Sequence, residues 1–211
     1  MTAIVSFVVL LALLYTSATT ALCFSVKTTS LASQPISMSL DSACNKQTVR
    51  TFSGCTVLLT GASGGLGRSL SLQLAHCKAH VLVLSGRNEE ALNAVERECK
   101  QIFPEIVTHV VTCDLSDQQS VVNLANKALE LCDGRIDVLI NNGGVSSRSR
   151  FLDTKLDVDE KVMQVNFFSG AALAKVVVPG MVDRGFGKVI WVSSVQGLCK
   201  LMLCGIRHAN F

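Results

Sequence analysis

A glycine-rich turn between an apolar run and an amphipathic run is the feature of this chain with the clearest chemical use. It reads Thr60-Gly61-Ala62-Ser63-Gly64-Gly65-Leu66-Gly67, and it predicts the order strand, tight turn and helix. Glycines let the backbone approach a phosphate, and a helix N-terminus supplies free N–H groups with a partial positive charge. The segment therefore predicts a cradle for the pyrophosphate of a dinucleotide, with these candidate binding residues: Gly61, Ser63, Gly64, Gly65, Leu66 and Gly67.

The segment Ser85-Gly86-Arg87-Asn88 stands where a dinucleotide-binding fold keeps the residue that reads the ribose. An acid there would accept hydrogen bonds from the 2′-hydroxyl and repel a 2′-phosphate. Gly86 removes the acid, and the guanidinium of Arg87 suits a phosphate. We therefore expect NADP(H) as the cofactor in preference to NAD(H). A solvated arginine after a turn is the alternative.

Polar residues follow the next expected strand as well. Asp114, with Leu115 beside it, stands where a carboxylate could reach the adenine amino group, whereas Ser116 or Asp117 could simply cap the next helix.

After a further strand, Asn142 can tie neighbouring strands together, and Gly143 and Gly144 would admit a ligand close to the backbone. Asn166 is a polar residue within an apolar stretch, so it either braces the core or belongs to a site.

Short β-branched runs alternate with longer helical patterns from Cys55 onward, which predicts an α/β fold with a Rossmann-like doubly wound parallel sheet. The expected strands are Thr56–Thr60, His80–Leu84, His109–Cys113, Asp137–Ile140 and Lys188–Ser193. The expected helices are Leu66–Cys77, Glu89–Phe103, Asp117–Leu131 and roughly Asp157–Met181. Ligands of such sheets bind beyond the carboxyl ends of the strands, where all the candidate residues lie.

Composition limits the alternatives. With 211 residues, 49% of them hydrophobic, the chain can bury one sizeable core, and a net charge of +3 is too small and dispersed to indicate nucleic acid binding. The nine cysteines are scattered without a C-x-x-C pair, and the four histidines do not cluster with them, so we expect no metal site. Scattered cysteines on apolar faces are usually buried thiols, which favours a reducing compartment.

Residues 1–26 form an apolar N-terminal segment that we expect to be helical. They fit a signal peptide, or a membrane anchor that leaves the rest of the chain in the cytosol, and we favour membrane association. Residues 27–53 are rich in Ser and Thr and are expected to be a linker. A hydrophobic leader before an acid-poor Ser/Thr stretch is also compatible with secretion or with two-part organelle targeting.

Over residues 54–197 the chain resembles the short-chain dehydrogenase/reductase superfamily, whose motifs T-G-x-x-x-G-x-G, N-N-A-G, a helix Asn and S-S-x-x-G occur in this order. Here they appear as Thr60–Gly67, Asn141–Gly144 (with Gly143 in place of the usual Ala), Asn166 and Ser193–Gly197. Segments 85–88 and 191–197 and the apolar N-terminus are similar to the membrane-anchored "member seven" branch. This implies the endoplasmic reticulum or another endomembrane, with the domain facing the cytosol.

The resemblance implies hydride transfer between NADP(H) and a small-molecule carbonyl or secondary alcohol. By position, Ser194 would hydrogen-bond the substrate oxygen and Asn166 would support a water in the proton relay. The acid/base would be a tyrosine about thirteen residues after Ser194, with a lysine four further on, because a phenol of pKa near 10 needs an ammonium beside it at neutral pH.

The chain departs from this pattern after residue 197. Its only tyrosine is Tyr15, the expected slots hold Arg207 and Phe211, and residues 198–211 resemble nothing in the family. Intact relatives continue with further strands and helices that build the substrate pocket and half of a homodimer interface. We therefore expect a sheet that is incomplete at its C-terminal side, an exposed edge on the strand at 188–193, no dependable dimer and impaired catalysis. The alternatives are an inactive nucleotide-binding or partner-sequestering isoform, or a non-functional truncated product.

Overall fold

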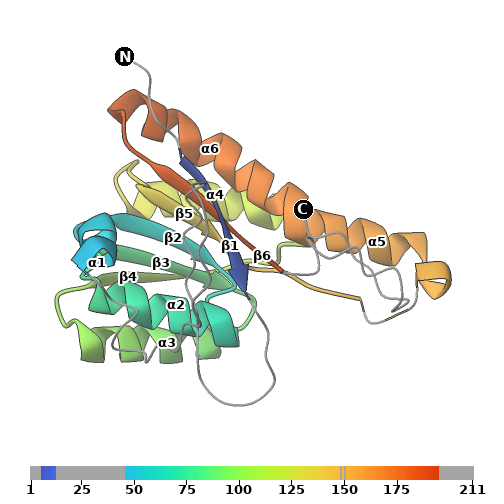
Figure 1. Ribbon diagram of the computed structural model, residues 1–211, viewed down its shortest axis with the longest axis horizontal. Helices are drawn as coiled ribbons and strands as arrows, with labels where there is room; N and C mark the ends of the chain where they lie inside the picture. Colours follow the sequence, from blue (N-terminus) through green and yellow to red (C-terminus); the bar gives the residue numbers. More distant parts are fainter. Residues whose placement is uncertain (1–5, 13–45, 148, 150, 195–211) are drawn as a thin grey trace, which may run out of the picture.

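The protein has a six-stranded sheet in which every neighbouring pair of strands is parallel (Figure 1). The computed structural model describes residues 6–12, 46–147, 149 and 151–194. The strand order is β1-β6-β5-β2-β3-β4. The strands are β1 (Ser6–Ala12), β2 (Thr56–Thr60), β3 (Val81–Gly86), β4 (Val107–Thr112), β5 (Val138–Asn141) and β6 (Lys188–Ser194).

Helices cover both faces of the sheet, as the alternating sequence pattern predicts (Figure 1). They are α1 (Lys46–Phe52), α2 (Gly65–His76), α3 (Glu89–Ile102), α4 (Gln118–Leu131), α5 (Leu156–Met163) and α6 (Ser169–Arg184), with a π-helical turn η3 (Gln164–Phe168) and a 3-10 turn η2 (Phe151–Asp153). Helices α2 and α3 pack together on one face, and α4 and α6 on the other. The five strands and four helices expected from the sequence are confirmed; β2 has the expected bounds, and the ends of the others differ by at most three residues.

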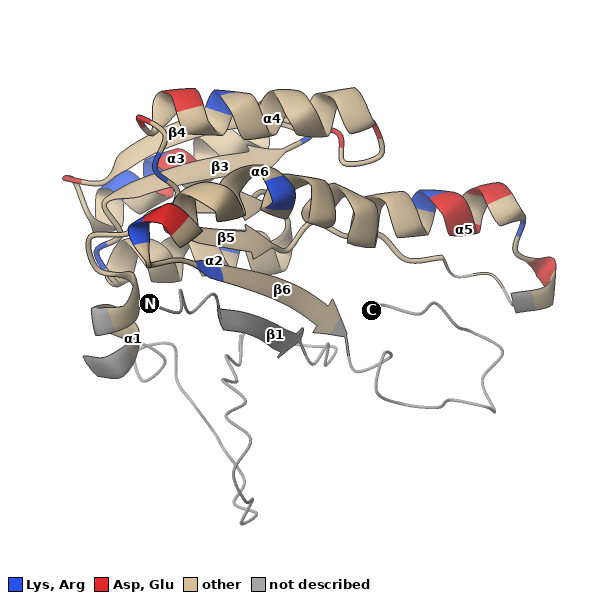
Figure 2. Cartoon of the chain, turned by 90° about the horizontal axis from the view of Figure 1, so that it is seen from above, with Lys and Arg blue, Asp and Glu red and all other residues tan. Residues whose placement is uncertain are grey.

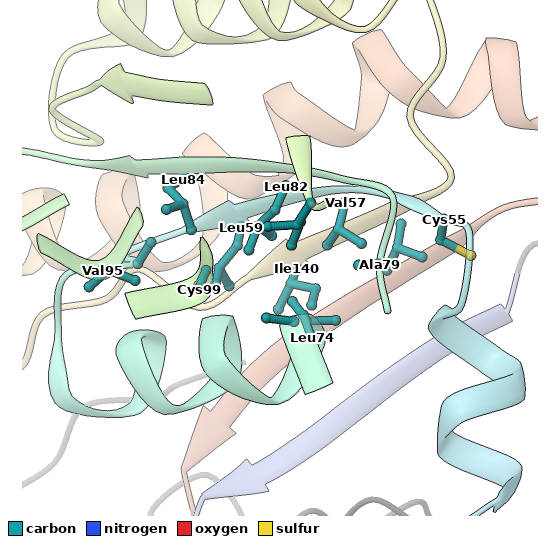
Figure 3. Close-up of a cluster of buried hydrophobic side chains, with 14 of the residues drawn as sticks. Cys55, Val57, Leu59, Leu74, Ala79, Leu82, Leu84, Val95, Cys99 and Ile140 are labelled. Atoms are coloured by element: carbon teal, nitrogen blue, oxygen red, sulfur yellow. The ribbon is translucent and has the colours of Figure 1, made fainter. Parts of the chain in front are cut away.

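The central strand β2 is buried on both sides, because its side chains alternate between two apolar clusters. Val57 and Leu59 pack beneath α2 and α3 (Figure 3), while Leu58 packs beneath α4 and α6, and all three are fully buried. A strand covered on both faces reads as a continuous apolar run, which is why 56–60 is recognisable in the sequence. The core thus fixes the carboxyl end of β2, from which the glycine-rich turn departs.

The chain reverses direction between β2 and β5. It proceeds outward from β2 to β3 and β4, then returns to β5 on the other side of β2. In open parallel sheets the loops at such a reversal diverge and leave a crevice at the carboxyl ends of the strands. The turn after β2 and the loop after β5 are therefore the two walls of the site.

The N-terminal segment differs from its prediction. Ser6–Ala12 form a strand that pairs along β6, so they cover the edge that the sequence predicts to be exposed. The expected apolar helix over residues 1–26 stays a prediction for the remainder of that segment. A short apolar run does not distinguish a strand from a helix by its periodicity, and the edge of β6 offers free N–H and C=O groups. The rest of the segment 1–26 and the tail 198–211 lie outside the described residues.

Two helical features need comment. The last residues of the expected linker, Lys46–Phe52, form α1, which the sequence does not predict.

The continuous helix 156–184 is long and apolar enough to cross a membrane by length and composition. Its α6 part packs against α4 and β5, however, which is the arrangement of a core helix. Its α5 end projects beyond the body of the fold (Figure 2).

The described cysteines are buried and form no disulfide, in agreement with the expectation of buried thiols: Cys55, Cys77, Cys99, Cys113 and Cys132. Burial raises the pKa of Cys99 from 9.0 to about 11, with the carboxylates of Glu98 and Glu96 adding to the effect. Burial likewise raises the pKa of Cys132 to about 11, helped by Asp133 and Asp137. These sulfurs stay protonated and unreactive at neutral pH.

This predicts a loss of stability in alkali. Between pH 9 and 11 the unfolded chain loses these two protons while the folded chain keeps them, so the free energy of unfolding falls as pH rises. Each thiol contributes a slope of about 1.4 kcal/mol per pH unit in this window. Denaturant unfolding at a series of pH values measures that slope. The double variant Cys99→Ala/Cys132→Ala should lose it, and an unchanged slope in the variant would contradict the assignment.

Candidate functional site

The glycine-rich turn after β2 is held by steric requirements that only glycine meets. Gly61 has φ +65°, and a Cβ there would lie 2.7 Å from the Cα of Gly143. A Cβ on Gly67 would collide with the carbonyl oxygen of Gly61. The Ala62 N–H donates to the carbonyl of Ser85 at 2.9 Å, which ties the turn to β3. The two outer glycines of the motif thus fix the turn.

The N-terminus of α2 is chemically unlike those of the neighbouring helices. Its N-cap is Gly64, with no side-chain cap, and its first turn holds no acid. By contrast, Asn88 Oδ1 accepts from the Ala91 N–H of α3, and the Asp117 carboxylate accepts from the first amides of α4. A Cβ on Gly65 would meet nothing within 4 Å. The free amides and the positive end of the helix dipole therefore face open space, which is the arrangement that binds an anion.

A hydrogen-bonded clamp joins this turn to the loop after β5. The Thr60 Oγ1 accepts from the N–H of Asn142 at 3.1 Å and of Gly143 at 3.0 Å, and donates to the carbonyl of Ile140 at 3.4 Å. The Asn142 Nδ2 donates to the carbonyls of Thr60 at 3.0 Å and Gly61 at 3.2 Å. Asn142 thus ties two neighbouring strands together, as its position suggested.

The structure gives a local reason why residue 143 is glycine, where the related motif has alanine. A Cβ at this position would lie 2.5 Å from Leu115 Cδ1, so the Leu115 side chain occupies the place of the missing methyl group. The loops after β4 and β5 therefore touch at this point, and Leu115 forms part of the wall between them.

Arg87 lies at the rim of an open depression of about 750 Å³ lined by Ser63, Arg87, Asn88, Glu89 and Glu90. A Cβ on Gly86 would come within 3.2 Å of Ser63 Oγ, so the glycine makes room for that hydroxyl. Arg87 is exposed and belongs to none of the ion pairs found among the described residues. A guanidinium and a hydroxyl converge here from two different loops.

Asp114 is partly committed to its own loop. Its Oδ1 accepts from the N–H of Ser116 at 2.9 Å and from Ser116 Oγ at 2.8 Å. These bonds, with a smaller contribution from the charge of Arg87, hold the pKa of Asp114 below its usual value. Asp114 is therefore an exposed carboxylate at neutral pH. The capping role that the sequence left open falls to Asp117.

Asn166 lies in the π-helical turn η3 and braces the loop after β5. Its Oδ1 accepts from the Val145 N–H at 2.8 Å, and its Nδ2 donates to the Val145 carbonyl at 2.9 Å. Trp191 Nε1 donates to the Asn166 carbonyl at 3.4 Å, so this tryptophan is more than core filling. A wider π-turn within a long helix is a common feature of functional sites. The role of Asn166 in holding a water stays a prediction.

The structure brings the predicted residues to one edge of the sheet. The turn 61–67 follows β2, Arg87 follows β3, Asp114 and Leu115 follow β4, Asn142, Gly143 and Gly144 follow β5, and Ser194 ends β6. Within the described part of the chain, no group of three His, Cys, Asp or Glu residues lies close enough to hold a metal ion.

Sequence reasoning missed the role of Thr60. The residue stands at the head of the glycine motif, where a threonine at the last position of a buried strand could have indicated a hydroxyl turned toward a neighbouring loop. Thr60 is buried, with 2% of its surface exposed, and its hydroxyl is fully used.

A family comparison matches this arrangement. The model of the short chain dehydrogenase family matches residues 55–205, which include all the loops described above. The chain belongs to the short chain dehydrogenase family. It is therefore a member of an oxidoreductase family, and the resemblance seen in the motifs is confirmed.

Individual relatives agree with the "member seven" resemblance. Dehydrogenase/reductase SDR family member 7B of Bos taurus is 42% identical over 149 residues, which cover 69% of this chain and 45% of the relative. Dehydrogenase/reductase SDR family member 7 of Homo sapiens is 39% identical over 159 residues, covering 72% of this chain and 46% of the relative. The chain spans about half the length of the curated relatives it matches.

Solved structures show the same fold. A short-chain dehydrogenase from Sphingobium yanoikuyae in complex with NADPH superposes with a TM-score of 0.66 at 26% identity, over 74% of this chain and 59% of that one. A metagenomic short-chain oxidoreductase in complex with NADP gives a TM-score of 0.63 at 31% identity, over 70% and 65% of the two chains.

The Thr60 clamp predicts a specific loss of stability. Thr60→Val keeps the shape of the side chain but leaves the N–H groups of Asn142 and Gly143 without their acceptor. We expect the free energy of unfolding to fall by about 1–3 kcal/mol. Urea denaturation measures this, with Thr112→Val on the exposed end of β4 as the matched control. Equal effects of the two substitutions would contradict the clamp.

Proposed function

We propose that this chain binds NADP(H) at the carboxyl edge of its sheet, with the cofactor's pyrophosphate at the N-terminus of α2. One observation carries the proposal. Of the three helices that follow β2, β3 and β4, α2 alone lacks a side-chain cap, and it faces open space at Gly65. An anionic ligand would supply the missing hydrogen-bond acceptors and complement the helix dipole.

The depression beside Arg87 supports NADP(H) over NAD(H). Arg87 would form a bidentate pair with a 2′-phosphate, and Ser63 Oγ could donate to the same group. Glu89 and Glu90 line the same depression, so the guanidinium has to outweigh two nearby carboxylates. The two solved structures described above as complexes with NADPH and NADP have the same fold.

The remaining residues would position the rest of the cofactor. Asp114 and Leu115 would line the adenine, and the ionised Asp114 would accept a hydrogen bond from its amino group. Gly143 and Gly144 would allow the cofactor to approach the backbone, and Asn142 and Asn166 hold that loop in place.

We propose that the reaction of the family pattern is hydride transfer between the nicotinamide and a small-molecule carbonyl or secondary alcohol. Ser194, at the end of β6, would hydrogen-bond the substrate oxygen. The proton needs an acid, and the only tyrosine of the 211 residues is Tyr15. This observation favours a second candidate function for the chain as given, namely nucleotide binding with little turnover.

We also propose that residues 1–26 associate the protein with an internal membrane such as the endoplasmic reticulum, with the dinucleotide-binding part on the cytosolic side. The support is the apolar composition of the segment and the positive charges that follow it.

Substituting Gly65 tests the pyrophosphate site. Gly65→Ala places a methyl group in space that is empty in the protein alone, so the melting temperature should stay unchanged while NADPH affinity falls by about tenfold or more. Gly180→Ala is the control, because it adds the same methyl group to a helix distant from the turn, where it would meet the guanidinium of Arg184 at 3.1 Å and the carbonyl oxygen of Gly134 at 3.8 Å. Calorimetric titration with NADPH measures both variants. Equal affinity of Gly65→Ala and the original chain would overturn the proposal.

Arg87→Ala tests cofactor choice independently. We expect NADPH affinity to fall by about 10- to 100-fold, because a charge-assisted hydrogen-bonded pair is lost. NADH affinity should stay within about twofold, because NADH has no 2′-phosphate to lose. Arg97→Ala removes the same charge from the exposed side of α3 and serves as the control. Equal losses for NADPH and NADH would reject the assigned role of Arg87.

A further inference from the structure

The edge strand β1 pairs with β6 over its whole length. The register runs from Ser6 opposite Lys188 to Ala12 opposite Ser194. On its other side, β6 pairs with β5 only from Lys188 to Trp191, where Asn141 ends the shared register. The last residues of β6, Val192–Ser194, therefore have β1 as their paired strand (Figure 1).

This matters because Ser194 is the residue assigned to the substrate oxygen. Val189 and Ile190 are held by core clusters on opposite faces of the sheet, so the first half of β6 is fixed by packing as well as by β5. Val192 is only partly buried, and the end of the strand extends past β5. Without β1, the outward N–H and C=O groups of β6 would lose their protein partners.

The paired residues also form part of the apolar segment suited to a membrane. A helix needs about 20 apolar residues to span a bilayer, and all its N–H groups must then bond within the helix. Residues 3–24 have that length, and they contain the whole of β1. The N–H groups of Ser6–Ala12 that bond to β6 cannot at the same time bond within a helix. Pairing with the sheet and insertion in a membrane are mutually exclusive.

We propose that Ser6–Ala12 is a detachable strand of this chain. Paired with β6, it holds Ser194 extended at the carboxyl edge of the sheet; inserted in a membrane, it releases that end of β6. The inference rests on the proposed roles of Ser194 and of the N-terminal segment. The same seven residues would thus position the site when paired with β6 and attach the protein to the membrane when inserted.

The direction of the N–H groups alternates along β1, and this gives the first test. The test needs neither nucleotide nor enzymatic activity. In a parallel pair, only every second residue of an edge strand directs its N–H toward its neighbour, and proline removes that N–H. Single proline substitutions at Val8, Val9, Leu10 and Leu11 should therefore alternate in effect. Two of them, two positions apart, should accelerate amide hydrogen exchange in β6, and the other two should change it much less.

Exchange in β3 is the internal reference, because β3 is paired on both sides by β2 and β4 and should stay protected in every variant that folds. Four prolines without effect, or with equal effects, would overturn the strand pairing. If the protection of β6 amides from hydrogen exchange decreases when the protein is diluted, a second copy of the chain supplies the strand. That result would overturn the intramolecular proposal.

Vesicles of phosphatidylcholine and phosphatidylserine test whether pairing with the sheet and insertion in a membrane exclude each other. When the full chain binds them, exchange in β6 should rise to the rate seen in a chain lacking residues 1–12, with β3 unchanged. Continued protection of β6 in the vesicle-bound chain would overturn the exclusion, as would failure of the full chain to bind vesicles. Neither result bears on nucleotide binding, which the Gly65→Ala titration tests by itself.

Discussion

The site depends on the close approach of two loops that are far apart in the sequence. Gly61 and Gly143 meet where the chain reverses its direction across the sheet, and no side chain fits between them. The Thr60 hydroxyl and the Asn142 amide hold this contact by bonding to the backbone of the opposite loop. Because buried backbone groups need partners, these bonds satisfy the ends of β2 and β5 as well as aligning the turn. The N-terminus of α2 is aimed at the crevice as a consequence.

Stability and function are divided between the two covered faces of the sheet and the carboxyl ends of its strands. The apolar clusters on both faces of β2 supply the burial that stabilises the fold, and their buried members are hydrophobic residues without a role in the proposed chemistry. The carboxyl ends carry the polar groups, several of which already have hydrogen-bond partners within the protein: Asp114 accepts from Ser116 in its own loop, and the loop after β5 is held at Val145 by Asn166 of η3. The amides at the start of α2 and the guanidinium of Arg87 have no such partner, so these are the groups offered to a ligand.

Much of this was predictable because it is local. The glycine motif, the β-branched runs and the helical patterns depend on neighbours within a few residues, and they led to the correct strands, helices and site edge. The bonds of Thr60 to residues 142 and 143 span more than 80 positions and leave no local pattern. The contact of Leu115 with Gly143 is hidden for the same reason. The strand β1 was missed because a short, largely apolar run suits a helix or a strand, and only the free edge of β6 decides between them.

Amide chemical shifts during titration with NADPH would test the central claim most directly. The account predicts that the backbone ¹⁵N–¹H signals of Gly65, Leu66 and Gly67 move together as the nucleotide saturates, since their N–H groups gain phosphate acceptors. The amides in the last turn of α3, at the end of the helix away from the carboxyl edge of the sheet, should move much less. Saturating NADPH that leaves the signals of residues 65–67 in place would contradict the account, because the N-terminus of α2 would then not be where the phosphates bind.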